Sequence, residues 1–180
     1  MTQAIDLAIA EIGTVEWAKG SNPKVVGYYK DAGHPEIKDD AVSWCSAFVG
    51  AMLQRSGIKP SGSLLARSYL KWGNPVPRDQ IKRGDIGIIP RGEAWQGHVF
   101  FIEAVKGPMV QAVGGNQRDS VSRTEFPISA LIGVRRAVAA KPVATNPLSP
   151  KPVADSPAQQ TVAKPSFIAR LWALITGAKL

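Results

Sequence analysis

Hydrophobic residues in the first part of the chain recur at the spacing of an α-helix. Within residues 5–12 they occupy one helical face, and Gly13 stands where a first helix would end. The Asn-Pro pair at 22–23 suits the cap and first turn of a second helix, which we expect to end near Gly33. The chain therefore opens with two short amphipathic helices.

Two further helices are predicted before the pattern changes. A third spans about 44–55, with its apolar residues on one face and Gly57 as its stop. Ser63 is placed to cap a fourth, which we expect to close at Trp72 and Gly73. The first half of the chain is therefore expected to be largely helical.

From Asp85 onward, short runs rich in Val, Ile and Phe alternate with Gly and Pro about every ten residues. This punctuation is typical of a small antiparallel sheet of about five strands. The predicted strands lie in DIGIIP, HVFFIEAV, PMVQAV, SVSRTEF and ALIGVRRA. Helices followed by strands predict an α+β fold.

The composition changes after Arg136. Residues 137–165 are rich in Ala, Val and Pro without aromatic residues or periodicity, which predicts an extended linker. Residues 166–180 predict a short amphipathic helix of roughly 22 Å, too short for the ~30 Å hydrocarbon core of a membrane. It can lie on an anionic membrane surface or dock onto the globular part. The face concerned comprises Phe167, Ile168, Leu171, Trp172, Leu174 and Ile175.

Composition and charge narrow the classes of function. A length of 180 residues with 44% apolar positions suits one globular domain, assigned to 1–136, and we expect a monomer. The net charge of +8 favours anionic partners, but the only adjacent basic pair is Arg135-Arg136, which disfavours nucleic acid. One cysteine excludes an internal disulfide, and two histidines are too few for a Cys/His zinc site. We expect no metal and no cofactor.

Cys45 lies at the predicted start of the third helix, where Asp40 or Ser43 could act as the cap. The unpaired amides and the dipole of a helix start stabilise a thiolate, so we expect a lowered cysteine pKa. A lone cysteine in an apolar helix can also be a packed core residue.

His98 opens a predicted strand directly after a turn, at a sheet edge where it can meet a helix start. There it would serve as a base for a thiol and later as an acid for a leaving amine. Asn116, in the loop VGGNQRD, is the expected third group that orients the ring, with Gln117 as the neighbouring alternative. Strand alternation directs Glu103 to the opposite face, and His34 lies in a polar turn.

These residues resemble a known family. The runs WCSAFVGAMLQRSGIKPSGSLLARSYLKWG, RGDIGIIPRG, GHVFFIEAV and VGGNQRDSV are similar to those of the CHAP and NlpC-type cysteine peptidoglycan hydrolases, especially phage and prophage members with a Trp-Cys motif. The resemblance covers roughly 1–136. It implies a papain-like fold, Cys45 as nucleophile, His98 as general base and acid, and Asn116 as the orienting residue.

The expected function is therefore an endolysin-like hydrolase that cleaves an amide bond in the peptide part of peptidoglycan. The sequence leaves open which amide bond is cut. Trp44, Trp95 and Gln117 are the expected substrate-binding residues. The alternatives are an injected antibacterial or toxin effector that uses the same triad for amidase, deamidase or acyl-transfer chemistry, and an inactive wall-binding module.

The expected location follows from the amino terminus. MTQAIDLAIAEIG places Asp6 and Glu11 within its apolar stretch and has no basic leading region, so it does not resemble a secretory signal peptide. We expect synthesis in the host cytoplasm and action in the periplasm or cell wall after release.

Overall fold

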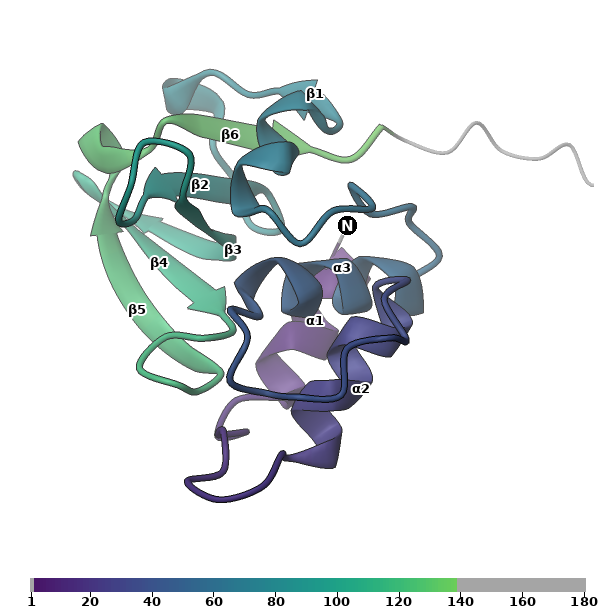
Figure 1. Cartoon of the computed structure of the whole chain (residues 1–180). Coiled ribbons are helices and arrows are strands. Elements are labelled where there is room, and N and C mark those ends of the chain that lie inside the picture. The colour runs from purple at the N-terminus through teal and green to yellow at the C-terminus, as the bar shows by residue number, and fades with distance from the viewer. Residues whose placement is uncertain (1, 139–180) are drawn as a thin grey trace, which may run out of the picture. The chain divides into compact units, whose positions relative to one another are not determined.

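The computed structural model describes residues 2–138, and Figure 1 shows the α-helices of this range gathered on one side of a sheet. The helices are α1 (Thr2–Ala10), α2 (Pro23–Asp31) and α3 (Cys45–Arg55). None of the helices within the described range is long and apolar enough to cross a membrane. The predicted terminal helix at 166–180 and nearly all of the predicted linker lie outside the described residues.

The helix ends follow local chemistry. The side-chain oxygen of Asn22 accepts a hydrogen bond from the backbone amide of Lys24 at 2.9 Å, and Pro23 is the first residue of α2, as expected. Gly13 takes a φ of 94°, which suits glycine, and its amide donates to the carbonyl of Val121 at 3.0 Å. The end of the first helical segment is thereby tied to the sheet-bearing half of the chain.

The expected fourth helix is wrong in extent and type. In its place lies a short 3-10 helix, η1 (Ala66–Lys71). The hydroxyl of Ser63 accepts from the amide of Leu65 at 3.2 Å, which forms a local turn and not a helix cap. Two further 3-10 turns are η2 (Arg78–Gln80) and η3 (Ile128–Ala130).

The sheet is antiparallel and has the order β1-β6-β2-β3-β4-β5. The α+β class expected from the sequence is confirmed, and all five predicted strands are present. A two-residue strand at the edge was not predicted, because an Asn-Pro pair carries no strand pattern. The strands are β1 (Asn74–Pro75), β2 (Ile86–Pro90), β3 (Gly97–Lys106), β4 (Met109–Gly114), β5 (Ser122–Pro127) and β6 (Gly133–Arg136).

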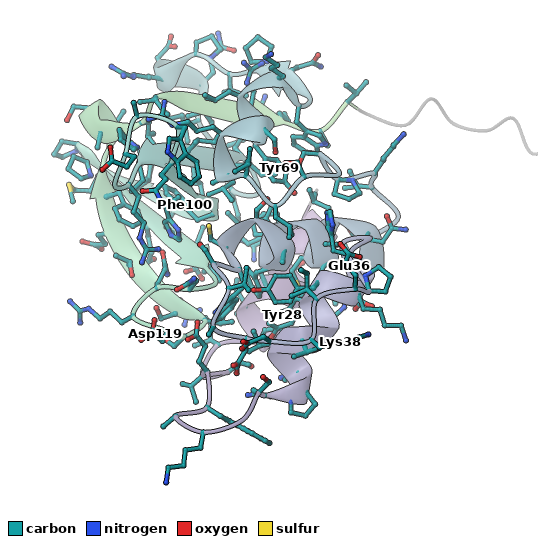
Figure 2. The ribbon with its side chains drawn as sticks, viewed as in Figure 1. Tyr28, Glu36, Lys38, Tyr69, Phe100 and Asp119 are labelled. Carbon is teal, nitrogen blue, oxygen red and sulfur yellow. The ribbon has the colours of Figure 1, made fainter. Side chains whose placement is uncertain are left out.

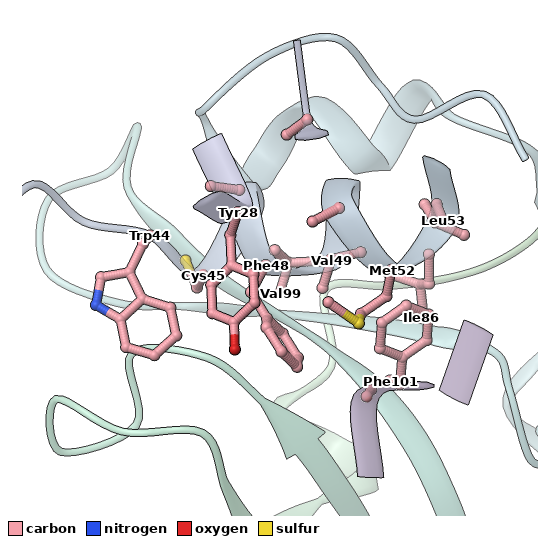
Figure 3. Packing of buried hydrophobic residues seen from close by; sticks show 14 of the residues in the cluster. Tyr28, Trp44, Cys45, Phe48, Val49, Met52, Leu53, Ile86, Val99 and Phe101 are labelled. Atoms are coloured by element: carbon pink, nitrogen blue, oxygen red, sulfur yellow. The ribbon is translucent and has the colours of Figure 1, made fainter. Parts of the chain in front are cut away.

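The two faces of the sheet bury separate clusters of apolar side chains. On one face, α3 packs against β3 and β4, and Figure 3 shows Trp44, which precedes the helix, and helix residues as far as Leu53 in one cluster with Val99 and Phe101. The other face buries a smaller cluster that includes Phe100. The start of β3 therefore lies between two cores, with its alternate residues directed into each.

A buried ion pair joins the beginning of β2 to the end of β6. The carboxylate of Asp85, which is 1% exposed, accepts from Nε and Nη2 of Arg136 at 2.7 and 2.8 Å. The same carboxylate accepts from the backbone amide of Lys82 at 2.9 Å. Its buried charge is therefore matched by a two-pronged partner and a third donor.

Gly115, directly after β4, allows the chain to pass closely over the start of α3. A Cβ atom at this position would stand 2.4 Å from the indole ring of Trp44 and 2.7 Å from Cβ of Phe48. Both aromatic side chains are fully buried, so neither can turn away into solvent. Only glycine fits here without moving the following loop, residues 115–120.

We expect Gly115→Ala to destabilise the protein by about 1–3 kcal/mol, because the added methyl group overpacks a closed aromatic cluster. Chemical unfolding followed by fluorescence or circular dichroism measures the change. Gly27→Ala is the matched control, since a Cβ atom there meets nothing within 4 Å inside α2. The control should gain about 0.5–1 kcal/mol from helix propensity. Equal effects of the two substitutions would contradict the proposed packing constraint.

Candidate active site

Cys45 is the first residue of α3 and is only 2% exposed. The first hydrogen bond of the helix runs from the amide of Phe48 to the carbonyl of Trp44 at 2.8 Å. The amides of the preceding three residues therefore open the helix without an acceptor inside it. These donors lie where a thiol and a carbonyl group attacked by it would gather negative charge.

The expected side-chain cap is absent from this helix start. Trp44 occupies the cap position and makes no side-chain cap hydrogen bond. Asp40 instead accepts from the backbone amides of Trp17 and Asn22 at 3.2 and 2.7 Å, so it fixes the segment before α2. The expected cap is therefore wrong, because a polar residue near a helix start can be committed to another segment.

Burial raises the pKa of the Cys45 thiol, contrary to the lowered value that the helix start led us to expect. Removal from water is the largest effect and disfavours the thiolate. The backbone amide of Val99, the hydroxyl of Ser43 and the charge of Arg91 act in the opposite direction without overcoming it. The resting thiol is therefore neutral, and a base is required to activate it.

A chain of hydrogen bonds fixes the ring of His98. Gln117 Nε2 donates to the carbonyl of Ser122 at 2.6 Å, so Gln117 Oε1 must face the ring. His98 Nε2 lies 3.1 Å from that oxygen, and since an amide oxygen only accepts, Nε2 carries the proton and donates it. The remaining ring nitrogen, Nδ1, is left with its lone pair, which is the form that a general base needs.

The free nitrogen of His98 is buried. Nδ1 has no hydrogen-bond partner within the described part of the chain, and the ring packs beside Phe100 and Phe126 with centroids 5.6 and 6.0 Å away. Burial lowers the pKa of His98 to about 4, with the charge of Arg91 acting in the same direction. The ring is therefore neutral at pH 7 and able to accept a proton.

Cys45 lies beside the residue that follows His98 on β3. The amide that influences the Cys45 thiol belongs to Val99, the residue directly after His98. Val99 and Cys45 belong to one buried cluster between α3 and β3. The start of α3 therefore packs on β3 next to the strand position of His98.

Asn116, the expected orienting residue, does not contact the ring. Its backbone takes a left-handed φ of 55°, its side-chain amide lies 3.5 Å from Ser43 Oγ, and its carbonyl accepts from Arg91 at 2.9 Å. The ring partner is Gln117, the alternative that the sequence analysis had named. Gln117 takes the place expected for Asn116 because the two neighbouring side chains point to different sides of the loop. Asn116 lies on the side of Cys45, and Gln117 lies on the side of His98.

A cleft of about 500 Å³ opens over Cys45. Trp95, 62% exposed, lines it, and its role in substrate binding stays a prediction. Trp44 does not line it, because its ring is fully buried against Tyr28 and Phe48 and donates to Glu16. Trp44 therefore acts on the cleft through Glu16, which is one of its lining residues.

Three charged residues that the sequence analysis did not single out also line this cleft: Glu16, Arg91 and Asp119. Figure 2 shows Asp119 where the sheet and the helical layer meet. Each stands in a connection between elements, where a charge carries no periodic signal. The Gly-rich loop at 114–120 was the one sequence feature that could have directed attention to Asp119.

The other polar candidates lie outside this constellation. His34 stands in a turn beside Glu36, with 3.1 Å between Nδ1 and Oε1, as its polar surroundings predicted. Glu103 pairs with Arg123 at 2.7 Å. Within residues 2–138, no group of three or more His, Cys, Asp or Glu side chains could hold a metal ion.

The sequence matches no known family profile and no curated protein. Among solved structures, the chain is similar to an NLP/P60 family protein from Staphylococcus aureus, described as similar to a lipoprotein, at 15% identity and a TM-score of 0.47. It is also similar to an NlpC/P60 family protein from Bacillus cereus, at 17% identity and a TM-score of 0.45. The matches cover 77% and 74% of this chain but only 41% and 39% of those proteins.

The lowered pKa of His98 makes the protein sensitive to acid. The folded ring binds a proton only near pH 4, whereas the histidine of the unfolded chain does so near pH 6.5. The neutral ring therefore favours the folded state fully above about pH 6.5, and this contribution to stability is lost as the pH falls toward 4. Between pH 7 and pH 5, we expect the free energy of unfolding of the wild type to fall by about 2 kcal/mol because of this residue.

Urea unfolding at the two pH values measures this loss. His98→Gln keeps a donor for Gln117 and removes the titration, so its loss should be smaller by that amount. His34→Gln, at the more exposed histidine, is the control and should behave as the wild type does. An equal acid sensitivity in the His98 variant would contradict the buried neutral ring.

Proposed function

We propose that the protein is a thiol-dependent hydrolase that cleaves an amide bond in the peptide part of peptidoglycan. The observation that supports the chemistry is that Cys45 opens a helix beside Val99, the neighbour of His98, and that the His98 ring has one nitrogen free and the other held by Gln117. The substrate class rests on the resemblance of the motifs around these residues to cysteine peptidoglycan hydrolases.

In the first half of the reaction, the Cys45 thiol gives its proton to His98 Nδ1 while sulfur bonds to the substrate carbonyl carbon. The resulting oxyanion faces the open amides at the start of α3, which donate to it. The C–N bond then breaks, and Nδ1 returns the proton to the leaving amine. The product of this half is a thioester on Cys45 and a free amine.

In the second half, water replaces the amine. His98 Nδ1 takes a proton from the water as its oxygen bonds to the thioester carbon. Breakage of the C–S bond releases a carboxylic acid, and the proton returns to sulfur. Gln117 holds the ring in the required tautomer throughout and exchanges no proton itself.

The finer role that we propose is endolysin-like: action on the bacterial wall during its lysis. The cleft supports a polymeric substrate, since exposed apolar side chains gather around it. Leu65 and Trp95, which are 53% and 62% exposed, both line the cleft. Such side chains can pack against the sugar and peptide faces of a wall polymer.

We expect Cys45→Ala to abolish cleavage of purified peptidoglycan, because no other group of the site can form the thioester. His98→Ala should lower kcat by about 10²–10⁴. Mass spectrometry of the released fragments measures the activity and names the bond cut. Products bearing a new free carboxylate support hydrolysis, whereas transfer to an added amine alone would support acyl transfer. Full activity of the Cys45 variant would refute the proposed function.

The role of Gln117 can be separated from that of Asn116. Gln117→Ala should lower kcat about 10-fold or more because the ring loses its orienting acceptor, while Asn116→Ala should have the smaller effect. Gln117→Glu should move the acidic limb of the pH–rate profile to higher pH, since a carboxylate beside the ring raises the pKa of His98. A larger loss in the Asn116 variant, with no pH shift in the Gln117 variant, would reverse the assignment.

A further inference from the structure

A second, smaller hollow adjoins His98 and is distinct from the cleft over Cys45. It has a volume of about 280 Å³, and its exposed lining is mostly apolar. His98 and Gln117 form part of its wall. We call it the His98 hollow; its other lining residues are Ile89, Pro90, Arg91, Arg118, Thr124 and Phe126.

Arg91 lines both the His98 hollow and the cleft over Cys45, and it is the only cation among the described residues that line that cleft. Its Nη1 donates to the carbonyl of Asn116 at 2.9 Å, which fixes the guanidinium near the junction of the two spaces. No carboxylate within residues 2–138 forms an ion pair with it. By contrast, Arg55, Arg83, Arg123 and Arg136 are all paired with acids.

Arg118 is the second cation of the His98 hollow, and it too lacks an acidic partner within the described range. Its backbone takes a φ of 54°, a conformation that costs a residue other than glycine roughly 1–2 kcal/mol. Asn116 and Asp119, with φ of 55° and 58°, adopt the same conformation, which their residue types tolerate more readily. The strained loop directs Asn116 and Asp119 to the cleft over Cys45, and Gln117 and Arg118 to the His98 hollow.

The reaction determines which part of the substrate lies beside His98. Because the ring must hand its proton to the departing amine, the leaving residue passes next to the imidazole. The cleft over Cys45 contains two carboxylates, Glu16 and Asp119, which repel a negative group. A carboxylate on the substrate is therefore directed away from them and toward the two arginines.

We propose that the His98 hollow binds the leaving residue of the substrate, an amino acid with a small apolar side chain and a free carboxylate. The apolar wall around Ile89 and Phe126 receives the side chain, and Arg91 and Arg118 bind the carboxylate. This inference rests on the proposed function and assigns the leaving-group preference of the same site.

The test compares two peptides with the same acyl part and a terminal alanine as leaving residue, one ending in a carboxylate and the other in a carboxamide. We expect the wild type to favour the carboxylate by about 10-fold or more in kcat/KM. Arg91→Gln and Arg118→Gln should each reduce the preference, and the double variant should remove it. Arg123→Gln, on β5 outside both spaces, is the matched control and should keep it.

The ratio of the two substrates separates recognition from structure, because a merely structural loss at Arg91 lowers both rates alike. An equal rate on both peptides, a preference that survives in the double variant, or cleavage of purified wall without cleavage of either peptide would overturn the leaving-group assignment. Failure to cleave purified wall and both peptides alike would instead overturn the proposed function.

Discussion

The close packing of the Trp44 indole against Gly115 is the constraint on which the site depends. It brings the loop at 115–120 down onto the start of α3, although the two segments are far apart in sequence. Gln117 then stands within hydrogen-bond distance of His98. Cys45 directly follows Trp44 in the chain. A methyl group added at Gly115 would push the loop at 115–120 away from the start of α3.

Burial gives this site its chemical character. Desolvation raises the pKa of Cys45 and lowers the pKa of His98, so both groups rest uncharged. In the proposed mechanism, proton transfer then accompanies the bonding of sulfur to the substrate carbonyl. A preformed thiolate would be open to oxidation and alkylation at all times. Under the proposed mechanism, the neutral groups stay protected until a bound substrate displaces water and supplies the oxyanion that the helix amides would stabilise.

Much of the fold could be predicted from the sequence because periodic apolar residues report burial directly. The three helices and five longer strands were found in this way, whereas η1 was mistaken for an α-helix because the Ser63 turn uses the same residue types as a cap. Cys45 and His98 were found because each opens a periodic element. Gln117 was ranked below Asn116 because sequence order does not show which side chain of a strained loop faces the ring. Arg91 and Asp119 line the cleft because of contacts between loops, and such contacts produce no periodic pattern in the sequence.

The Asp85–Arg136 ion pair has a mechanical consequence. The described fold is essentially complete at Arg136, whose guanidinium is held by two bonds to a carboxylate at the start of the neighbouring strand β2. A pull on the chain beyond this point is met first by that ion pair and by the ladders of β6 with β1 and β2. The strand that carries His98 and the loop that carries Gln117 lie further across the sheet. Tension at the carboxyl end can thus be resisted without disturbing the hydrogen bond between His98 and Gln117.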